Sequence, residues 1–476
     1  MFLKLSKWSL YGAFFAPVIV LYWNFFPFIG GKYYFFRGMT ELSLIFLILF
    51  WGFEAKRGEL LHAVKTFFRK PLVIAVTVFV GAVLLATLFA YDSHAAFWSN
   101  YERGEGGFQM LHYYLFFLLA LFLFREEREW RIAFWVACAA GALVILYGVA
   151  AAGFFSVKDA QGQVIYAFIG PYTNGDASPT FLGRLFAPAA RFQGSLGNPA
   201  YVAPYLMFAL FYLFFAWVRR RGTKKWWIHL GYGALAAFFF LFFILSQTRG
   251  AFLGLGVGVM VFLMYLVFSD KRFRRIGIGA FLGLILLFGI LFHFRDTAFI
   301  QRIPGNRFLY SSLQEQTAQT RFWTWGSAWQ GFLDRPLLGW GPENFSTVFD
   351  KYFDPRHYVP GKNTETWFDR AHSVVFDYLA ETGILGFASY LGIFAVFFWE
   401  FARLKPLPHG GSPAHHKEHE SRHHFGIDMS AAGRGLLLVL PIAYLIQGLA
   451  IFDVLPMYLN LFFFLALAVF TLEPHS

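Results

Sequence analysis

The sequence consists largely of continuously apolar runs, each about as long as a lipid bilayer is thick. A helix needs roughly 20 apolar residues to cross the hydrocarbon core, whereas a transmembrane β-strand needs about ten with alternating polarity. Because helices satisfy their own backbone hydrogen bonds in lipid, the sequence predicts an all-α, polytopic membrane protein. We count about twelve helix-length runs, at 9–27, 38–54, 71–90, 108–124, 131–153, 198–218, 228–247, 250–268, 275–294, 374–402, 433–452 and 454–472.

The composition excludes a soluble protein. Only 14% of the residues are charged and 58% are hydrophobic, whereas soluble domains carry about 25% charged residues. The net charge of +12 does not indicate nucleic-acid binding, because Lys and Arg lie in short loops between apolar runs. Cys138, the only cysteine, lies inside an apolar run, so no intrachain disulfide is expected.

The distribution of Lys and Arg orients the chain across the membrane. Cytoplasmic loops carry an excess of these residues. The loops that do so are 54–70, 125–131, 219–225 and 269–275. The loops between them are poorer in Lys and Arg, so both termini are expected to be cytoplasmic. Lys4 and Lys7 precede the first run as in a signal peptide, but no small-residue cleavage site follows, and we interpret this run as a retained first helix.

We interpret residues 1–476 as a single integral membrane domain with three longer loops. Segments 154–197 and 295–372 are predicted to be external, and 404–432 cytoplasmic. The cytoplasmic segment is rich in His, Gly, Ser and Pro; histidines suit a metal, but their irregular spacing favours a linker. Segment 295–372 is the one long polar interruption on its side, and we predict that it carries the catalytic residues.

Within this long external loop, residues 320–333 predict a helix that lies along the membrane surface. Phe322, Trp325, Trp329 and Phe332 share one face at helical spacing. Arg321 and Trp325 are four positions apart, a spacing that suits a cation–π pair. The alternative is an anchoring helix whose arginine only orients it.

Arg249 lies in a turn so short that the flanking runs must form a tight hairpin. It is the only charge in its loop, on the side where positive charge is sparse. A guanidinium near a helix N-terminus suits a diphosphate. The alternative is an arginine that extends to lipid head groups. Arg191, in RFQGSLGNPA, and Asp453, between the last two runs, are weaker candidates for the same site.

His372 stands where the long external loop meets the next apolar run. A neutral imidazole there can accept a proton from a sugar hydroxyl near neutral pH. The alternative is a histidine that caps the start of a helix. Asp377 and Glu381 follow about one and two helical turns later, and Asp377 either orients the histidine or pairs with an arginine.

Three stretches, in this order, resemble the O-antigen ligase family, which shares a core with the O-antigen polymerases and the protein O-oligosaccharyltransferases. They are LSQTRGAFLG, TRFWTWGSAWQGFLDRPLLGWGPENF and AHSVVFDYLAETGILG, and the resemblance is specific from about Leu235 to Phe387. It implies a GT-C-like glycosyltransferase that needs no metal or other cofactor and acts at the outer face of the bacterial inner membrane. The implied donor is a glycan on undecaprenyl diphosphate, transferred with inversion to a hydroxyl of a glycolipid or other surface acceptor, among membrane lipids.

The resemblance also implies roles for individual residues. Arg249 and Arg321 match the arginines that hold the diphosphate, and His372 matches the histidine that deprotonates the acceptor. Asp453 matches an acidic residue before the last span. The expected substrate-binding residues are Arg191, Trp325 and Asp453. No metal ligand is expected.

The chain departs from the family pattern at Thr248, Ser373 and Ala200, none of which carries an assigned role. Our leading interpretation is a ligase that transfers a finished polymer to a lipid A–core-type or other surface acceptor. A repeat-unit polymerase and a protein O-oligosaccharyltransferase stay open as alternatives. An anion transporter is disfavoured, because the centres of the apolar runs are nearly free of charge.

Overall fold

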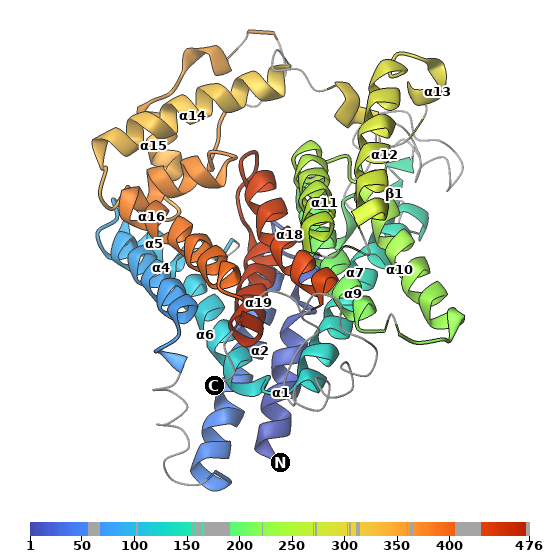
Figure 1. Ribbon diagram of the computed structural model, residues 1–476. Coiled ribbons are helices and arrows are strands. Elements are labelled where there is room, and N and C mark those ends of the chain that lie inside the picture. The colour runs from blue at the N-terminus through green and yellow to red at the C-terminus, as the bar shows by residue number, and fades with distance from the viewer. Residues whose placement is uncertain are drawn as a thin grey trace. The chain divides into compact units, whose positions relative to one another are not determined.

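The computed structural model describes residues 1–55, 67–100, 103–154, 157–158, 164–165, 191–220, 222–269, 271, 274–301, 303, 306–310, 315–358, 360–361, 366–404 and 430–472. Figure 1 colours the elements by their order in the chain, which forms two compact units. Unit 1 comprises Met1–Leu123, Ser311–Ala402 and Gln447–Val469, and unit 2 comprises Phe124–Tyr310, Arg403–Ile446 and Phe470–Ser476.

Within the described residues, 10 helices are long and apolar enough to cross a membrane. They are α2 (Gly30–Phe53), α4 (Pro71–Leu88), α7 (Glu127–Phe154), α9 (Pro199–Val218), α10 (Trp226–Leu245), α11 (Arg249–Ser269), α12 (Arg274–His293), α16 (Val374–Ala402), α18 (Ala431–Gly448) and α19 (Leu455–Leu472). Helix α6 (Gly107–Leu123) is apolar but shorter. The described strands, β1 (Val157–Lys158) and β2 (Val164–Ile165), form one short antiparallel pair. The predicted fold class, an all-α polytopic membrane protein, is confirmed.

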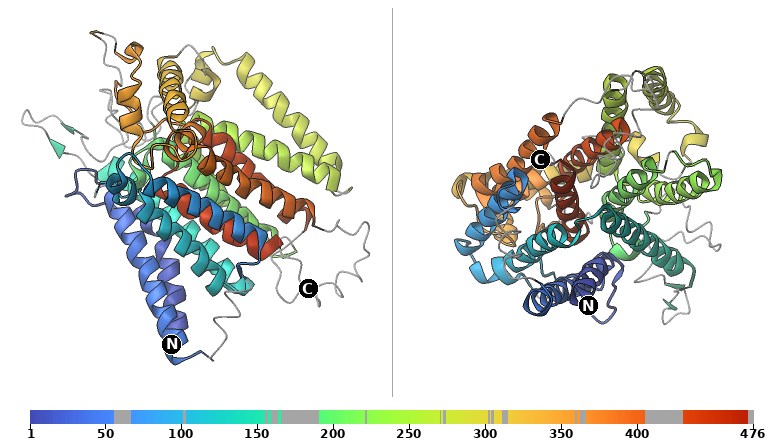
Figure 2. Two further views of the ribbon diagram at one scale, coloured as in Figure 1. Left: turned by 90° about the vertical axis from the view of Figure 1, so that its left-hand side faces the viewer. Right: turned by 60° about the horizontal axis from the view of Figure 1, so that its bottom comes forward.

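The first predicted span, 9–27, is wrong. The chain begins with α1 (Phe2–Ala13) and a short 3-10 helix, η1 (Ala16–Val18). Helix α1 has 12 residues, a length of about 18 Å, which is less than the roughly 30 Å of a hydrocarbon core. It packs antiparallel on α2, with the amino group of Met1 2.8 Å from a carboxylate oxygen of Glu54 just beyond the end of α2 (Figure 2).

Helix α2 begins at Gly30, whereas the sequence placed its start at residue 38. The charged residues before position 38 indicated a loop, yet the first of them is satisfied inside the protein. Lys32 is buried, and its ammonium group donates to the carbonyl oxygens of Pro17 at 2.9 Å and Ile19 at 2.5 Å. Because the ammonium group of Lys32 is hydrogen-bonded to these carbonyl oxygens, Lys32 can be buried inside α2. The helix therefore begins before the charged residues that suggested a loop.

Aromatic side chains tie the membrane helices of unit 1 together. Phe14 at the end of α1 meets Phe463 of α19 with ring centroids 4.8 Å apart. Tyr113 of α6 stacks on Tyr458 of α19 at 5.0 Å. Helix α19 is therefore the central element of this core. The loop that carries Asp453 directly precedes this helix.

Helix α16 is broken at Gly383, whose φ of 63° is left-handed, so the predicted span 374–402 is two helical pieces. The backbone groups freed by the break bond to the loop that follows α14. The pairs are Ile384 N to Pro336 O at 2.8 Å, Leu385 N to Leu337 O at 3.3 Å, Trp340 N to Ala380 O at 2.9 Å and Gly341 N to Glu381 O at 2.8 Å. This crossing of two backbones leaves no room for a Cβ atom at Gly383.

Helix α14 (Gln316–Asp334) contains the predicted helix 320–333 but packs through its small residues. The buried positions are Thr320, Thr324, Ser327, Ala328 and Gly331. This face rests on α16 and on α15 (Phe345–Lys351), which leads to η4 (Pro355–His357). Phe322 and Trp329 stay 40% and 44% exposed. These exposed aromatic rings support an interfacial position, which stays a prediction.

Unit 2 contains α7, α9, α10, α11, α12 and most of α18. Helix α7 packs on α9 through Phe134 and Tyr212, which stack at 5.6 Å. Three further short elements are η2 (Gly194–Leu196), α13 (Ala298–Gln301) and η3 (Asn306–Tyr310). Most of the predicted external loop 154–197 and nearly all of the predicted linker 404–432 lie outside the described residues.

Candidate active site

The chain around His372, which we call the histidine segment (Arg370–Val374), is held by hydrogen bonds to three parts of unit 1. They come from α14, from the first turn of α16 and from the loop before α19. The contacts are Trp325 Nε1 to Ala371 O at 2.9 Å, Ala371 N to Asp377 Oδ1 at 2.6 Å and Val374 N to Ile451 O at 3.1 Å. The backbone of this segment therefore has one defined path.

His372 itself has a left-handed φ of 57°. Such a conformation is uncommon for residues other than glycine, and costs on the order of 1 to 3 kcal/mol. It persists only where the surroundings impose it, and the bonds on both sides of His372 do so.

The ring of His372 has a defined orientation and tautomer. Its Nδ1 lies 3.1 Å from the carbonyl oxygen of Arg370. Since a carbonyl can only accept, Nδ1 carries the hydrogen, and Nε2 of the neutral ring has the lone pair. Phe368 and Phe452 flank the ring nearly edge to face, with centroids at 5.4 and 5.1 Å. This arrangement suits a general base that uses Nε2.

The surroundings keep this ring neutral. Burial lowers the pKa of His372, and the guanidinium groups of Arg321 and Arg103 lower it further, against the opposing effects of the Arg370 carbonyl and Asp369. The imidazole therefore stays unprotonated to a lower pH than an exposed histidine. Arg321 is near enough to act on the ring electrostatically, so the structure brings two of the predicted catalytic residues together.

Trp325 lies on α14 one turn after Arg321. Its indole stacks on Phe376 with centroids 5.0 Å apart, and its N–H donates to Ala371. Trp325 therefore supports the histidine segment. Its predicted contact with substrate and its cation–π pair with Arg321 stay predictions.

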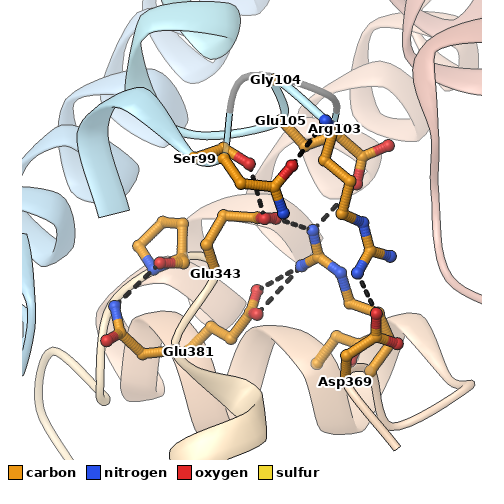
Figure 3. Close-up of polar contacts among 12 residues, drawn as sticks. Ser99, Arg103, Gly104, Glu105, Glu343, Asp369 and Glu381 are labelled. Atoms are coloured by element: carbon orange, nitrogen blue, oxygen red, sulfur yellow. Dashed lines mark hydrogen bonds and ion pairs between the residues drawn. The ribbon is translucent and has the colours of Figure 1, made fainter. Parts of the chain in front are cut away.

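Arg370 lies at the centre of a buried ion-pair network that the sequence did not predict, and Figure 3 labels the acidic residues of this network. Its guanidinium contacts three carboxylates, which we call the carboxylate clamp: Glu105, Glu343 and Glu381. Nη1 donates to both oxygens of Glu381 at 2.9 and 3.0 Å, and Nη2 donates to Glu105 at 2.9 Å and to Glu343. Only 8% of Arg370 is exposed. Removal of one partner from an ion pair this deeply buried is strongly destabilising.

Further polar contacts extend the clamp. Ser99, just after α5 (Ser93–Trp98), donates to Glu343 at 2.8 Å, and the hydroxyl of Tyr33 donates to Glu105. Burial raises the pKa of Glu105, although the nearby guanidinium of Arg370 opposes this. Burial also disfavours charge on Arg370, but the three clamp carboxylates outweigh it and raise its pKa well above the ordinary value.

Asp377 lies in the first turn of α16, and Asp453 lies in the loop before α19. Asp377 accepts from the backbone of Ala371, so it shapes the turn before α16. Asp453 is 6% exposed and interacts electrostatically with Tyr378. The structure therefore places Asp453 in unit 1 with His372, Arg321 and Trp325.

The other two predicted residues, Arg191 and Arg249, occur together in unit 2. We call Ser246–Arg249 the arginine turn; it links α10 directly to α11, so the predicted tight hairpin is confirmed. Arg191 donates through Nε to the carbonyl of Ser246 at 3.3 Å. The hydroxyl of Thr248 donates to the carbonyl of Pro199 at 2.8 Å. These contacts join RFQGSLGNPA to the arginine turn, with Arg249 as the first residue of α11.

Sequence reasoning missed the roles of Arg370, Glu105 and Glu343, and of the ion pair between Arg103 and Asp369. The available signal was that Glu343 lies in the second stretch that carries the family resemblance and that Arg370 directly precedes the third. In the part of the chain that the structure describes, no group of three or more His, Cys, Asp or Glu side chains is arranged to hold a metal ion.

The fold and this site define a multi-pass membrane protein whose polar chemistry is gathered at the end of a broken helix. Residues 234–391 match the family model described as O-antigen ligase. This match, over about a third of the chain, supports assignment to the O-antigen ligase family and indicates a glycosyltransferase-like membrane enzyme of the ligase or polymerase type. A search of curated proteins found no match. The matched residues include Arg249, Arg321, His372 and two of the clamp carboxylates.

Proposed function

We propose that this protein transfers a glycan from undecaprenyl diphosphate to a hydroxyl of a surface acceptor, most specifically as an O-antigen or polysaccharide ligase. The observation that carries this proposal is the ring of His372, which presents a basic Nε2 beside the positive charge of Arg321. The family match supports the class of reaction.

In the proposed reaction the acceptor oxygen attacks the anomeric carbon of the donor sugar. A new glycosidic C–O bond forms while the C–O bond to the diphosphate breaks, so the configuration inverts. The hydroxyl proton passes to Nε2 of His372. Undecaprenyl diphosphate leaves with its negative charge stabilised by Arg249 and Arg321, and Arg191, Trp325 and Asp453 contribute to substrate binding.

Guanidinium groups take the part that a metal plays in other enzymes of diphosphate chemistry. We therefore expect the purified enzyme to keep its activity in EDTA. Loss of activity that Mg²⁺ or Mn²⁺ restores contradicts this part of the proposal.

We further propose a location in the bacterial inner membrane, with both termini cytoplasmic and the long loop 295–372 outside. The excess of Lys and Arg in the alternate loops supports this orientation, and the pairing of Met1 with Glu54 is compatible with it. Single cysteines introduced into a Cys138→Ala background test the topology through an impermeant thiol reagent. Labelling of the His-rich segment 404–432 in intact cells contradicts the orientation.

Deleting the gene in the source organism tests the function. A ligase mutant accumulates full-length polymer on its lipid carrier and lacks it on the surface acceptor. A mutant that makes only single repeat units indicates a polymerase instead. Unchanged surface glycans and glycoproteins overturn the proposal.

A further inference from the structure

The carboxylate clamp raises the question of what the buried Arg370 does. Three acidic residues converge on its guanidinium from separate parts of the chain: Glu105 before α6, Glu343 before α15 and Glu381 in α16 (Figure 3). Both terminal nitrogens are occupied, and the residue is 8% exposed. Arg370 is therefore not placed to hold a diphosphate.

The backbone of Arg370 makes the contact that matters for chemistry. Its carbonyl oxygen accepts the Nδ1–H of His372 at 3.1 Å. A carbonyl that holds one nitrogen of a catalytic imidazole determines which nitrogen is basic and where it points. This carbonyl belongs to the peptide group between Arg370 and Ala371, so its position depends on the anchoring of the Arg370 side chain.

Anchoring by a guanidinium is geometrically strict. Its N–H groups lie in one plane with fixed directions, and Glu381 takes two bonds from Nη1 while Glu105 and Glu343 take bonds from Nη2. A lysine ammonium carries the same charge but cannot reproduce this pattern. Burial is the main cause of the raised pKa of Glu105, and the guanidinium groups of Arg370 and Arg103 oppose it.

We propose that Arg370 is a positioning residue: clamped by Glu105, Glu343 and Glu381, it fixes the carbonyl that selects and aims the basic tautomer of His372. This inference rests on the proposed function, because it assigns Arg370 a role through the base of that reaction. It assigns Arg370 no contact with substrate.

Other charges also face His372 and must be held constant in a test. They are Arg321 on α14, Arg103 in the segment before α6, and Asp369 beside Arg370. Arg370→Lys leaves all three in place and conserves the charge at position 370. A change in turnover then reports geometry rather than net charge.

The experiment is a double-mutant cycle with the full-length purified protein. Arg370→Lys, His372→Ala and the double variant are assayed with lipid-linked glycan and acceptor lipid, both extracted from the native membranes. We expect Arg370→Lys to lower kcat about 10- to 100-fold per folded molecule, with KM for the donor changed less than about twofold. In the His372→Ala background, the same substitution is expected to cause no further loss, because residues that act through one group are not additive.

Arg356→Lys is the matched control, since Arg356 is exposed and pairs locally with Asp354; it should leave kcat unchanged. ¹⁵N-histidine spectra give a second readout, because the Nδ1–H tautomer of His372 should lose population in Arg370→Lys. Glu343→Gln, which keeps a hydrogen-bond acceptor, replaces Arg370→Lys if the latter does not fold.

The possible outcomes distinguish failure of the proposed function from failure of the positioning role of Arg370. Near-normal turnover of His372→Ala contradicts the role of His372 as the base, and with it the proposed function. An inactive His372→Ala variant beside a fully active Arg370→Lys variant overturns only the positioning role. So does a double variant that shows the full product of the two losses.

Discussion

The histidine segment of unit 1 and the arginine turn of unit 2 have similar backbones and different surroundings. Each contains a non-glycine residue with left-handed φ, 57° at His372 and 52° at Gln247. Each is fixed by a neighbouring stretch, since Val374 N donates to Ile451 O at 3.1 Å and Phe192 N donates to Leu245 O at 2.9 Å. Both are therefore rigid connections that start a membrane helix.

The difference lies in the charges that each connection meets. Beside the histidine segment, carboxylates gather around Arg370 and neutralise it. At the arginine turn, Arg191 and Thr248 instead bond to backbone carbonyls. An arginine held by acids can support a neighbouring base, and the N-terminus of a helix such as α11 carries a positive field that attracts an anion. We therefore propose proton transfer at the histidine segment and a contribution to anion binding at the arginine turn, where Arg249 acts in addition to Arg321 of α14.

The largest effect is expected at the base. His372→Ala should lower kcat by about 10³-fold, within the range for removing a general base. Binding of undecaprenyl diphosphate, followed by intrinsic fluorescence, should stay within about twofold, because the histidine acts on the acceptor. Turnover that survives in this variant contradicts the assignment of His372 as the base, and with it the proposed function.

Substitution of the two arginines should weaken binding of undecaprenyl diphosphate, unlike substitution of His372. Arg249→Lys and Arg321→Lys should each lower the rate by about 10²-fold, the scale for removing one stabilising donor. An ammonium cannot bond two phosphate oxygens as a guanidinium does, so binding of undecaprenyl diphosphate should weaken as well. Unchanged binding in either variant removes that arginine from the diphosphate site.

Much of the fold was predictable because runs of about 20 apolar residues have few alternatives in lipid. The error at the N-terminus has a physical origin. Lys32 reads as a loop residue, but its partners Pro17 and Ile19 lie in a segment that only the folded chain brings near. Local polarity cannot reveal a buried charge that is paired across a hairpin.

Candidate site residues could be predicted where they lie in one recognisable stretch of sequence. Contacts between residues far apart in the sequence could not be predicted. His372, Arg321 and Arg249 stand in stretches that resemble a known family. Glu105 and Arg370 are far apart in the sequence, and no spacing rule pairs them. Asp377 and Glu381 were correctly noted near the histidine, yet they bond to Ala371 N and to Arg370.

A smaller effect should follow from opening the break in α16. Gly383→Ala places a Cβ against the backbone of Leu337 and forces an alanine into a left-handed φ. We expect a loss of about 1 to 3 kcal/mol, seen as a lower thermal unfolding midpoint in detergent. Gly392→Ala, in the same helix with nothing within 4 Å of the added Cβ, is the control and should be neutral or slightly stabilising. Equal midpoints for the two variants contradict the interlocked break.

The smallest expected effect is a shift in pH dependence that tests whether the charge of Arg321 acts on His372 within unit 1. The pKa of His372 is below its ordinary value, first through burial and then through Arg321 and Arg103. A general base works when neutral, so kcat/KM should be level above this lowered pKa and fall as the pH drops through it. Removing the cation in Arg321→Gln makes protonation easier, so the acidic limb should move to higher pH, relative to a lower plateau. Arg356→Gln removes an exposed charge that is paired with Asp354 and should leave the limb in place. An acidic limb that does not move in Arg321→Gln shows that the guanidinium acts on the diphosphate without influencing the base.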